Sequence, residues 1–183
     1  MKIYKYLISF LIILLFILPV HSIQTNKLNQ LFAKLKKIDN IKDADLLEKK
    51  IWAIWNKHPN NIKLTNKLEF GTELMYNGDY NYALTVFNNI IYVDPNWSEA
   101  LNKRATLLYF MGDFDKSLTD IDKVLSMESR HFGALSGQAQ IYIKLQKYEL
   151  AIESLKKARR IHPTIRGNST IIELEELIKN QSI

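Results

Sequence analysis

The chain has 183 residues, of which 47% are hydrophobic and 24% are charged, and it contains no cysteine. This composition fits one folded domain and argues against a wholly disordered or wholly membrane-embedded chain. The lack of cysteine excludes disulfides, thiolate metal sites, a cysteine nucleophile and a lipid-modified cysteine. The formal net charge of +6 is spread over many segments, so it does not indicate a nucleic-acid-binding surface.

Residues 1–22 have the composition of a secretory signal peptide. Lys2 and Lys5 precede an apolar run over residues 7–18, and a small residue, Ser22, stands at a possible cleavage site. Cleavage there would release a periplasmic or secreted chain. The alternative is a retained anchor in the inner membrane with the folded part facing the periplasm, because the apolar stretch approaches the roughly 18 to 20 residues that span a bilayer.

Residues 23–63 are expected to form an N-terminal helical cap, either a degenerate repeat or an addition specific to the family. Apolar residues at helical spacing predict one amphipathic helix over residues 26–37 and a second over residues 43–57. Such a cap would cover the start of the array that follows. We expect Trp52 and Trp55 to bury the join between the cap and the first unit of that array.

From residue 64 to residue 165, one pattern of side chains recurs three times at a step of 34 residues. Aligning Gly71 with Ala105 and Ala139 also aligns three further sets, namely Ala83, Ser117 and Ala151, then Phe87, Ile121 and Leu155, then Pro95, Ser129 and Pro163. Within each unit the apolar residues recur at steps of three and four, which predicts two helices. A fixed period of this size predicts a stacked array of helical hairpins.

The same point in each unit separates the two predicted helices. The first two units carry Asn77-Gly78-Asp79 and Met111-Gly112-Asp113 there. Glycine can end a helix in the left-handed conformation, and aspartate can cap the next helix. The third unit has Leu145-Gln146-Lys147 at this point and has lost both devices.

This pattern resembles the tetratricopeptide repeat (TPR), in three units over residues 64–97, 98–131 and 132–165. The resemblance implies an all-α fold, a right-handed superhelical solenoid of helical hairpins with N- and C-terminal capping helices. Residues 166–183 would be the C-terminal capping helix, and Thr170 and Glu173 have the spacing of a capping box. The whole chain is also similar to a group of short secreted bacterial TPR proteins without an established activity.

No pattern of catalytic or metal-binding residues stands out. His58, His131 and His162 lie near predicted helix ends and not at metal-ligand spacing, so we expect them to cap or to pack. Acidic pairs such as Asp120 and Asp122 are expected on solvated faces. We therefore expect no enzyme, no cofactor and no metal. A hydrolase that uses His131 and the acidic pairs is the remaining catalytic alternative.

The resemblance implies that the first helices of the units line a concave groove. Carried over to this chain, the residues expected to face a partner are Tyr76, Asn102, Lys103, Thr106, Tyr109, Phe110, Gln140 and Lys144. Amide, hydroxyl and aromatic groups suit an extended peptide or a partner helix, because they bond backbone groups and offer apolar contact. The clamp for a C-terminal carboxylate found in some relatives is not expected, because its positions here hold Leu68, Thr72, Lys103, Gly133 and Gly137.

These observations favour a noncatalytic protein-interaction module, a TPR scaffold or adaptor exported to the cell envelope, that binds a protein or peptide in its groove. The alternative is a membrane-anchored structural or oligomerising spacer in the envelope. No nucleic-acid partner is expected, and membrane contact is expected only through an uncleaved N-terminal segment.

Overall fold

The structure is a computed structural model that describes residues 24–181, and the predicted signal peptide or anchor lies outside these residues. Every regular element among them is a helix. After a helix over residues 24–35 come α2 (Ile41–Trp55), α3 (Ile62–Tyr76), α4 (Tyr80–Val93), α5 (Ser98–Phe110), α6 (Phe114–Met127), α7 (Phe132–Lys144), α8 (Tyr148–Ile161) and α9 (Asn168–Gln181). Over residues 24–181, none of these helices has the length and apolar character needed to cross a membrane.

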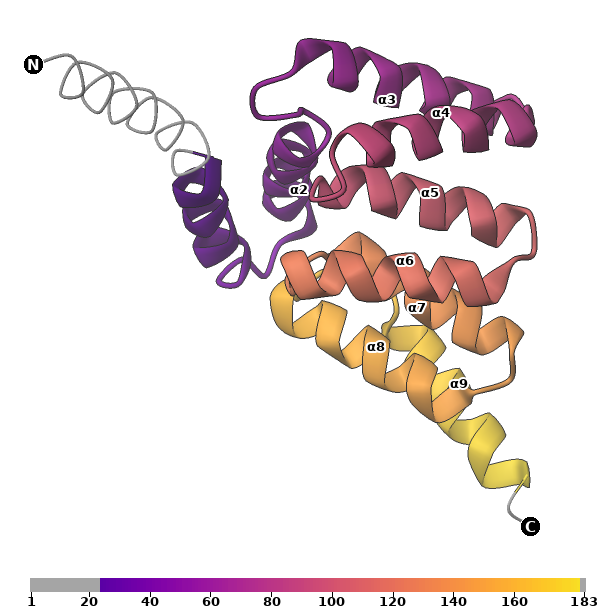
Figure 1. Cartoon of the computed structure of the whole chain (residues 1–183). Coiled ribbons are helices and arrows are strands. Elements are labelled where there is room, and N and C mark those ends of the chain that lie inside the picture. The colour runs from indigo at the N-terminus through magenta and orange to yellow at the C-terminus, as the bar shows by residue number, and fades with distance from the viewer. Residues whose placement is uncertain (1–23, 182–183) are drawn as a thin grey trace, which may run out of the picture.

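Helices α3 to α8 form three hairpins that stack in a row (Figure 1). The closest contacts join α3 to α4, α5 to α6 and α7 to α8, and further contacts join α4 to α5 and α6 to α7. Each hairpin therefore packs on the next along the chain. The predicted all-α solenoid of helical hairpins is confirmed.

Small residues at the aligned positions allow the two helices of a hairpin to approach closely. A β-carbon on Gly71 in α3 would lie 2.7 Å from the ring of Phe87 in α4, closer than carbon atoms can pack. In the second hairpin the buried Ser117 hydroxyl donates a hydrogen bond of 2.7 Å to the carbonyl of Ala105. The recurring small residues thus set the spacing inside each hairpin.

The turn inside each hairpin has the same backbone geometry. Gly78 and Gly112 adopt φ values of +88° and +78°, as predicted, and Gln146 takes the same left-handed conformation at 57° in the third unit. Asp113 caps α6 with its side chain, also as predicted, whereas Asp79 makes no side-chain capping bond to α4. The third hairpin therefore keeps the turn without the glycine that favours it.

The N-terminal helices do not cover the first hairpin. They form a hydrophobic cluster with Phe132 and Ile161 of the third hairpin and with Ile165, which follows it. No residue of α3 or α4 belongs to this cluster. Figure 1 shows these helices beside the array, with the outer side of α3 uncovered. The expectation that Trp52 and Trp55 bury the join to the first repeat is met only by one bond, from the Trp97 indole to the Trp55 carbonyl at 3.1 Å, because both rings contact Phe132 of the third hairpin.

Helix α9 covers the last hairpin, but it begins earlier than its predicted cap. The amide of Ile171 donates to the carbonyl of Gly167, so Asn168 starts the helix and Thr170 lies inside its first turn. The predicted capping box at Thr170 is therefore wrong. Ile171 and Leu174 pack against Ala151, Ile152 and Leu155 of α8.

Candidate interaction groove

A hollow of about 190 Å³ lies between α5 and α7, the first helices of the second and third hairpins. Five of the eight predicted groove residues line it, namely Asn102, Thr106, Tyr109, Phe110 and Gln140. Ser117 and Ile121 of α6 also contribute to its wall. The 34-residue register therefore brings side chains from two repeats to one site.

The hollow exists because α7 presents small residues where α5 presents large ones. Gly133, Ser136 and Gly137 line the α7 side, opposite Tyr109 and Phe110 of α5. A β-carbon on Gly137 would meet only the Ile121 side chain, at the ordinary contact distance of 3.8 Å. The space beside Gly137 is therefore open and free of steric strain.

Aromatic contacts hold the α5 side of the hollow. The ring of Tyr109 lies 5.7 Å from that of Phe114, and the ring of Phe110 stacks on that of Tyr80 at 6.2 Å. Phe110 remains 45% exposed and Gln140 is exposed on the facing helix. The site thus offers an apolar aromatic edge on one side and an amide on the other.

Asn102 and Lys103 are both engaged with Glu99, a fully buried carboxylate at the start of α5. The Asn102 amide donates to Glu99 at 3.3 Å, and the Lys103 ammonium lies 3.3 Å from the same carboxylate. Burial opposes ionisation of Glu99, but the hydrogen bond from His131 and the charge of Lys103 outweigh it and hold the pKa of Glu99 below its usual value. These two predicted residues therefore stabilise a buried charge.

His131 connects this carboxylate to the start of α7. The Ala134 amide donates to His131 Nδ1 at 3.1 Å, so the proton of the ring lies on Nε2, which is 3.1 Å from Glu99. The ring is completely buried and stacks on the Trp55 indole at 4.1 Å. The predicted capping role of His131 is confirmed, and the ring has no exposure through which to reach a substrate.

Helix α2 occupies the part of the groove that adjoins the starts of α5 and α7. A β-carbon on Gly133 would lie 2.6 Å from the Trp52 indole, and the Lys103 ammonium lies 5.7 Å from the centre of the indole. Lys103 is one of the residues expected to face a partner, and Gly133 stands at one of the clamp positions. Among residues 24–181, α2 therefore covers the groove at the starts of α5 and α7, and the groove is open toward the C-terminal ends of these helices.

Tyr76 and Lys144 lie outside the hollow. Tyr76 ends α3 with 72% of its surface exposed, and Lys144 is exposed at the end of α7. Neither residue is among those that line the space between α5 and α7. Their part in binding stays a prediction.

The acidic residue Asp120 is buried, and the expectation that it lies on a solvated face is wrong. Arg104 donates two hydrogen bonds of 2.7 Å to its carboxylate, which fixes α5 against α6. In the sequence, an arginine 16 residues before an acid gives no local signal of this pair. Within residues 24–181 no group of His, Cys, Asp or Glu side chains could hold a metal ion.

The other two described histidines also pair with acids. His58 Nε2 lies 2.8 Å from Asp94, and His162 Nε2 lies 3.0 Å from Glu48 of α2. Both rings therefore link separate segments of the chain. The hydrogen bond from His162, opposed by burial, holds the pKa of Glu48 below its usual value.

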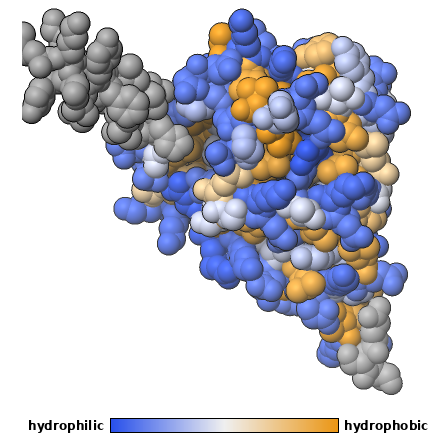
Figure 2. Space-filling model, in the orientation of Figure 1, coloured by the Kyte–Doolittle hydropathy of each residue, from blue (hydrophilic) through white to orange (hydrophobic). Residues whose placement is uncertain are grey.

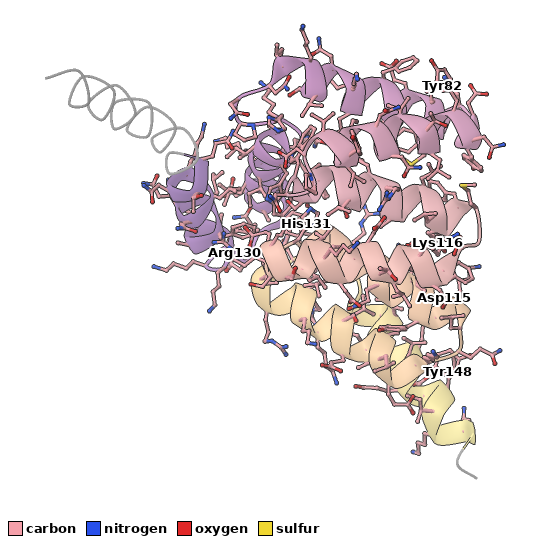
Figure 3. All side chains as sticks on the ribbon, in the orientation of Figure 1. Tyr82, Asp115, Lys116, Arg130, His131 and Tyr148 are labelled. Carbon is pink, nitrogen blue, oxygen red and sulfur yellow. The ribbon has the colours of Figure 1, made fainter. Side chains whose placement is uncertain are left out.

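A larger hollow of about 910 Å³ lies between the first helix and the loops that join the hairpins. Its ionisable side chains include two pairs, His58 with Asp94 and Arg130 with Glu128. Figure 3 shows Arg130 and His131 beside the N-terminal helices, on the side of the array opposite to the turns within the hairpins. This hollow therefore lies away from the predicted groove residues.

Comparison with known proteins supports the repeat assignment. A sequence model of the tetratricopeptide repeat family matches residues 133–164. A TPR repeat-containing protein of Rhizobium etli is 31% identical over 140 residues, which cover 76% of this chain and 68% of that protein. A match to the DnaJ homolog subfamily C member 7 homolog of Schizosaccharomyces pombe, 28% identical, covers 52% of this chain and 21% of that protein.

Solved structures share the fold at low sequence identity. The first TPR domain of Spaghetti (RPAP3), bound to an HSP90 peptide, superposes with a TM-score of 0.62 at 16% identity, over 66% of this chain and 96% of that one. The Yersinia enterocolitica chaperone SycD, in complex with a peptide of the translocator YopD, superposes with a TM-score of 0.60 at 14% identity, over 69% of this chain and 100% of that one. Three stacked hairpins, the repeat match and the Rhizobium relative together show that the chain belongs to the tetratricopeptide repeat family.

Proposed function

We propose that this chain is a noncatalytic adaptor of the cell envelope, and that the hollow between α5 and α7 holds one side chain of an extended peptide or partner helix. The observation that carries the proposal is the open space beside Gly137, faced by Tyr109 and Phe110. Aromatic edges of this kind commonly anchor a partner side chain. The neighbouring polar groups would fix the partner's orientation.

The size of the hollow favours a peptide anchor over a small-molecule ligand. Its volume of about 190 Å³ is below the roughly 300 to 1,000 Å³ of ligand pockets. Space of this size accommodates about one large apolar side chain. The Spaghetti domain and SycD, which share the fold, were each solved with a bound peptide, and this supports a peptide as the class of partner.

The position of α2 limits how a partner would enter. Trp52 covers the groove beside Gly133, so a peptide would lie toward the ends of α5 and α7. There the Thr106 hydroxyl donates to the Asn102 carbonyl at 3.0 Å and retains oxygen lone pairs that can accept from a peptide amide. The exposed Gln140 amide can both donate and accept. We expect a short bound segment with one apolar anchor.

Export of the chain is part of the proposal and is supported by its N-terminal sequence. Lys2 and Lys5, the apolar run after them and the small residue Ser22 fit a cleaved signal peptide. Determining the N-terminal residue of the protein isolated from its own cells tests this. We expect a start at Ile23, whereas retention of residues 1–22 would support the anchored spacer instead.

Site-specific crosslinking tests the groove itself. A photoreactive amino acid in place of Gln140, in the full chain and in its own cells, should yield a discrete crosslinked protein. The same amino acid at Lys123, exposed on the second helix of the middle hairpin, is the control. No product from Gln140, or the same product from both positions, would contradict binding in the hollow.

A further inference from the structure

The outer face of α3 lacks the helix that covers the equivalent face of α5 and α7. The 34-residue register places Phe70 at the position of Arg104 and Gln138. Arg104 reaches back to Asn88 on α4 at 2.8 Å, and Gln138 reaches back to Asp122 on α6 at 3.4 Å. Within residues 24–181 no helix of the array precedes α3, so Phe70 remains 42% exposed.

A second aligned position shows the same difference. Leu101 and Leu135 are 2% and 3% exposed, and each lies on a first helix that another hairpin precedes. The equivalent residue of α3 is Lys67, which is exposed. At this position the two units that follow another hairpin have a buried leucine. The first unit, which no hairpin precedes within residues 24–181, has an exposed lysine. Phe70 is the exception to this rule.

The exposed face is aromatic at its centre. The Phe70 ring packs edge-on against Tyr82 of α4 at 5.7 Å, and Tyr82 is 56% exposed. Figure 2 shows hydrophobic residues gathered among hydrophilic ones over the α3 and α4 end of the array, and Figure 3 places Tyr82 at this end. Exposed aromatic residues with a charged border are typical of an interaction surface.

The charges on this face complement themselves. Lys67 lies three residues before Phe70 and Glu73 lies three residues after it, and both are exposed. On a helix these steps of three put Lys67 about 4.5 Å before Phe70 and Glu73 about 4.5 Å after it along the axis, each rotated about 60° from Phe70 in opposite directions. A two-fold axis that passes between the Phe70 residues of two antiparallel α3 helices therefore brings Lys67 of one copy level with Glu73 of the other.

We propose that this face binds a second copy of the same chain, with the two α3 helices antiparallel and Phe70 at the two-fold axis. The two Phe70 rings and the two Tyr82 rings form the centre of the contact, and two Lys67–Glu73 pairs form its border. Isologous contacts of this kind use one patch twice, which the symmetric spacing of the charges satisfies. The contact also replaces the missing preceding hairpin, and it leaves the groove between α5 and α7 free.

A single cysteine tests the contact directly, because the chain has no other cysteine and any disulfide must join two copies. Packed helices lie about 8 to 10 Å apart, which leaves roughly 3.5 to 5.5 Å between facing Cα atoms. That range overlaps the Cα separations of disulfides. The variant Phe70→Cys of the full chain should form a covalent dimer under mild oxidation, and the control Lys123→Cys should not. No dimer from F70C, or equal dimer from both, would overturn the proposal.

A charge exchange tests the pairing. In the F70C background, K67E and E73K should each weaken the dimer roughly tenfold, because each variant puts like charges opposite one another at both ends of the contact. The double variant K67E/E73K restores both pairs and should recover the yield of F70C alone. Equal melting temperatures check that every variant is folded. A double variant as weak as the single ones would overturn the proposed arrangement.

Discussion

The Trp52 indole lies so close to Gly133 that a β-carbon on this glycine would come within 2.6 Å of the ring. This contact joins the N-terminal helices to the third hairpin, across the groove. The neighbouring Trp55 ring stacks on His131 at 4.1 Å, which places a second indole at the start of α7. The position of α2 over part of the groove thus depends on a glycine.

We expect Gly133→Ala to displace Trp52 and to lower the free energy of unfolding by about 1 to 3 kcal/mol, as overpacking of a buried contact does. The matched control is Gly137→Ala on the same helix, where the new β-carbon meets only Ile121, at 3.8 Å. Its gain in helix propensity should leave the stability unchanged or raise it by up to about 1 kcal/mol. Urea unfolding followed by tryptophan fluorescence measures both, and equal effects would contradict the contact.

The turn at Gln146 offers a substitution that stabilises the fold. Its φ of 57° is left-handed, which costs a residue with a β-carbon about 1 to 2 kcal/mol relative to glycine. Gln146→Gly should therefore raise the melting temperature, as the glycines at the equivalent turns suggest. The same substitution at Gln140, inside α7, should lower stability by about 0.5 to 1 kcal/mol. Thermal unfolding by circular dichroism distinguishes these results, and a loss of stability in Q146G would refute the turn geometry.

The Arg104–Asp120 pair should contribute strongly to the contact between α5 and α6. Arg104→Ala leaves the buried Asp120 carboxylate without its partner, and the loss of one member of such a pair costs about 3 to 5 kcal/mol. The double variant R104A/D120A should regain part of this stability, because no buried charge remains. Lys116→Ala, which breaks the exposed pair with Asp113, should change the stability far less, because solvent screens this pair. Denaturant unfolding compares the three variants, and an effect of R104A as small as that of K116A would contradict the burial of Asp120.

The Glu48–His162 bond predicts a dependence of stability on pH. Because the pKa of Glu48 is lowered in the folded state, its carboxylate stabilises the fold above the unfolded value of 4.5. This contribution is lost as the pH falls through the folded pKa. The variant Glu48→Gln should therefore melt lower than the native chain near about pH 6, and the difference should shrink below about pH 4.

Glu69→Gln, which changes an exposed acid of α3, is the control for this titration. Its melting temperature should follow that of the native chain across the same pH range. A difference between E48Q and the native chain that stays constant down to about pH 3 would show that the bond to His162 does not lower the pKa of Glu48.

The 34-residue register predicted the array because each hairpin repeats the same close contacts. Gly71, Ala105 and Ala139 occupy equivalent places, so one unit predicts the next. The resemblance to the tetratricopeptide repeat, applied through this register, identified Thr106, Tyr109 and Gln140 as groove residues, and they share one site. Local spacing is sufficient here, because neighbouring units along the sequence are also neighbours in space.

The place of the N-terminal helices could not be predicted in this way. Their aromatic residues Trp52 and Trp55 contact His131 and Phe132, which are far along the chain and belong to no common period. Apolar spacing indicated that these helices bury one face but not which surface receives it. For the same reason the sequence did not show that the start of α7 is covered by α2.

The most direct test of the account is whether the hollow beside Gly137 must stay empty for a partner to bind. Gly137→Leu places an apolar side chain in this space, and its β-carbon meets only Ile121, at 3.8 Å, so we expect the variant to fold. In its own cells, the full chain carrying a photoreactive amino acid at Gln140 should then lose the crosslinked protein that forms when Gly137 is retained. Undiminished crosslinking in G137L, with an unchanged melting temperature, would contradict binding in the hollow.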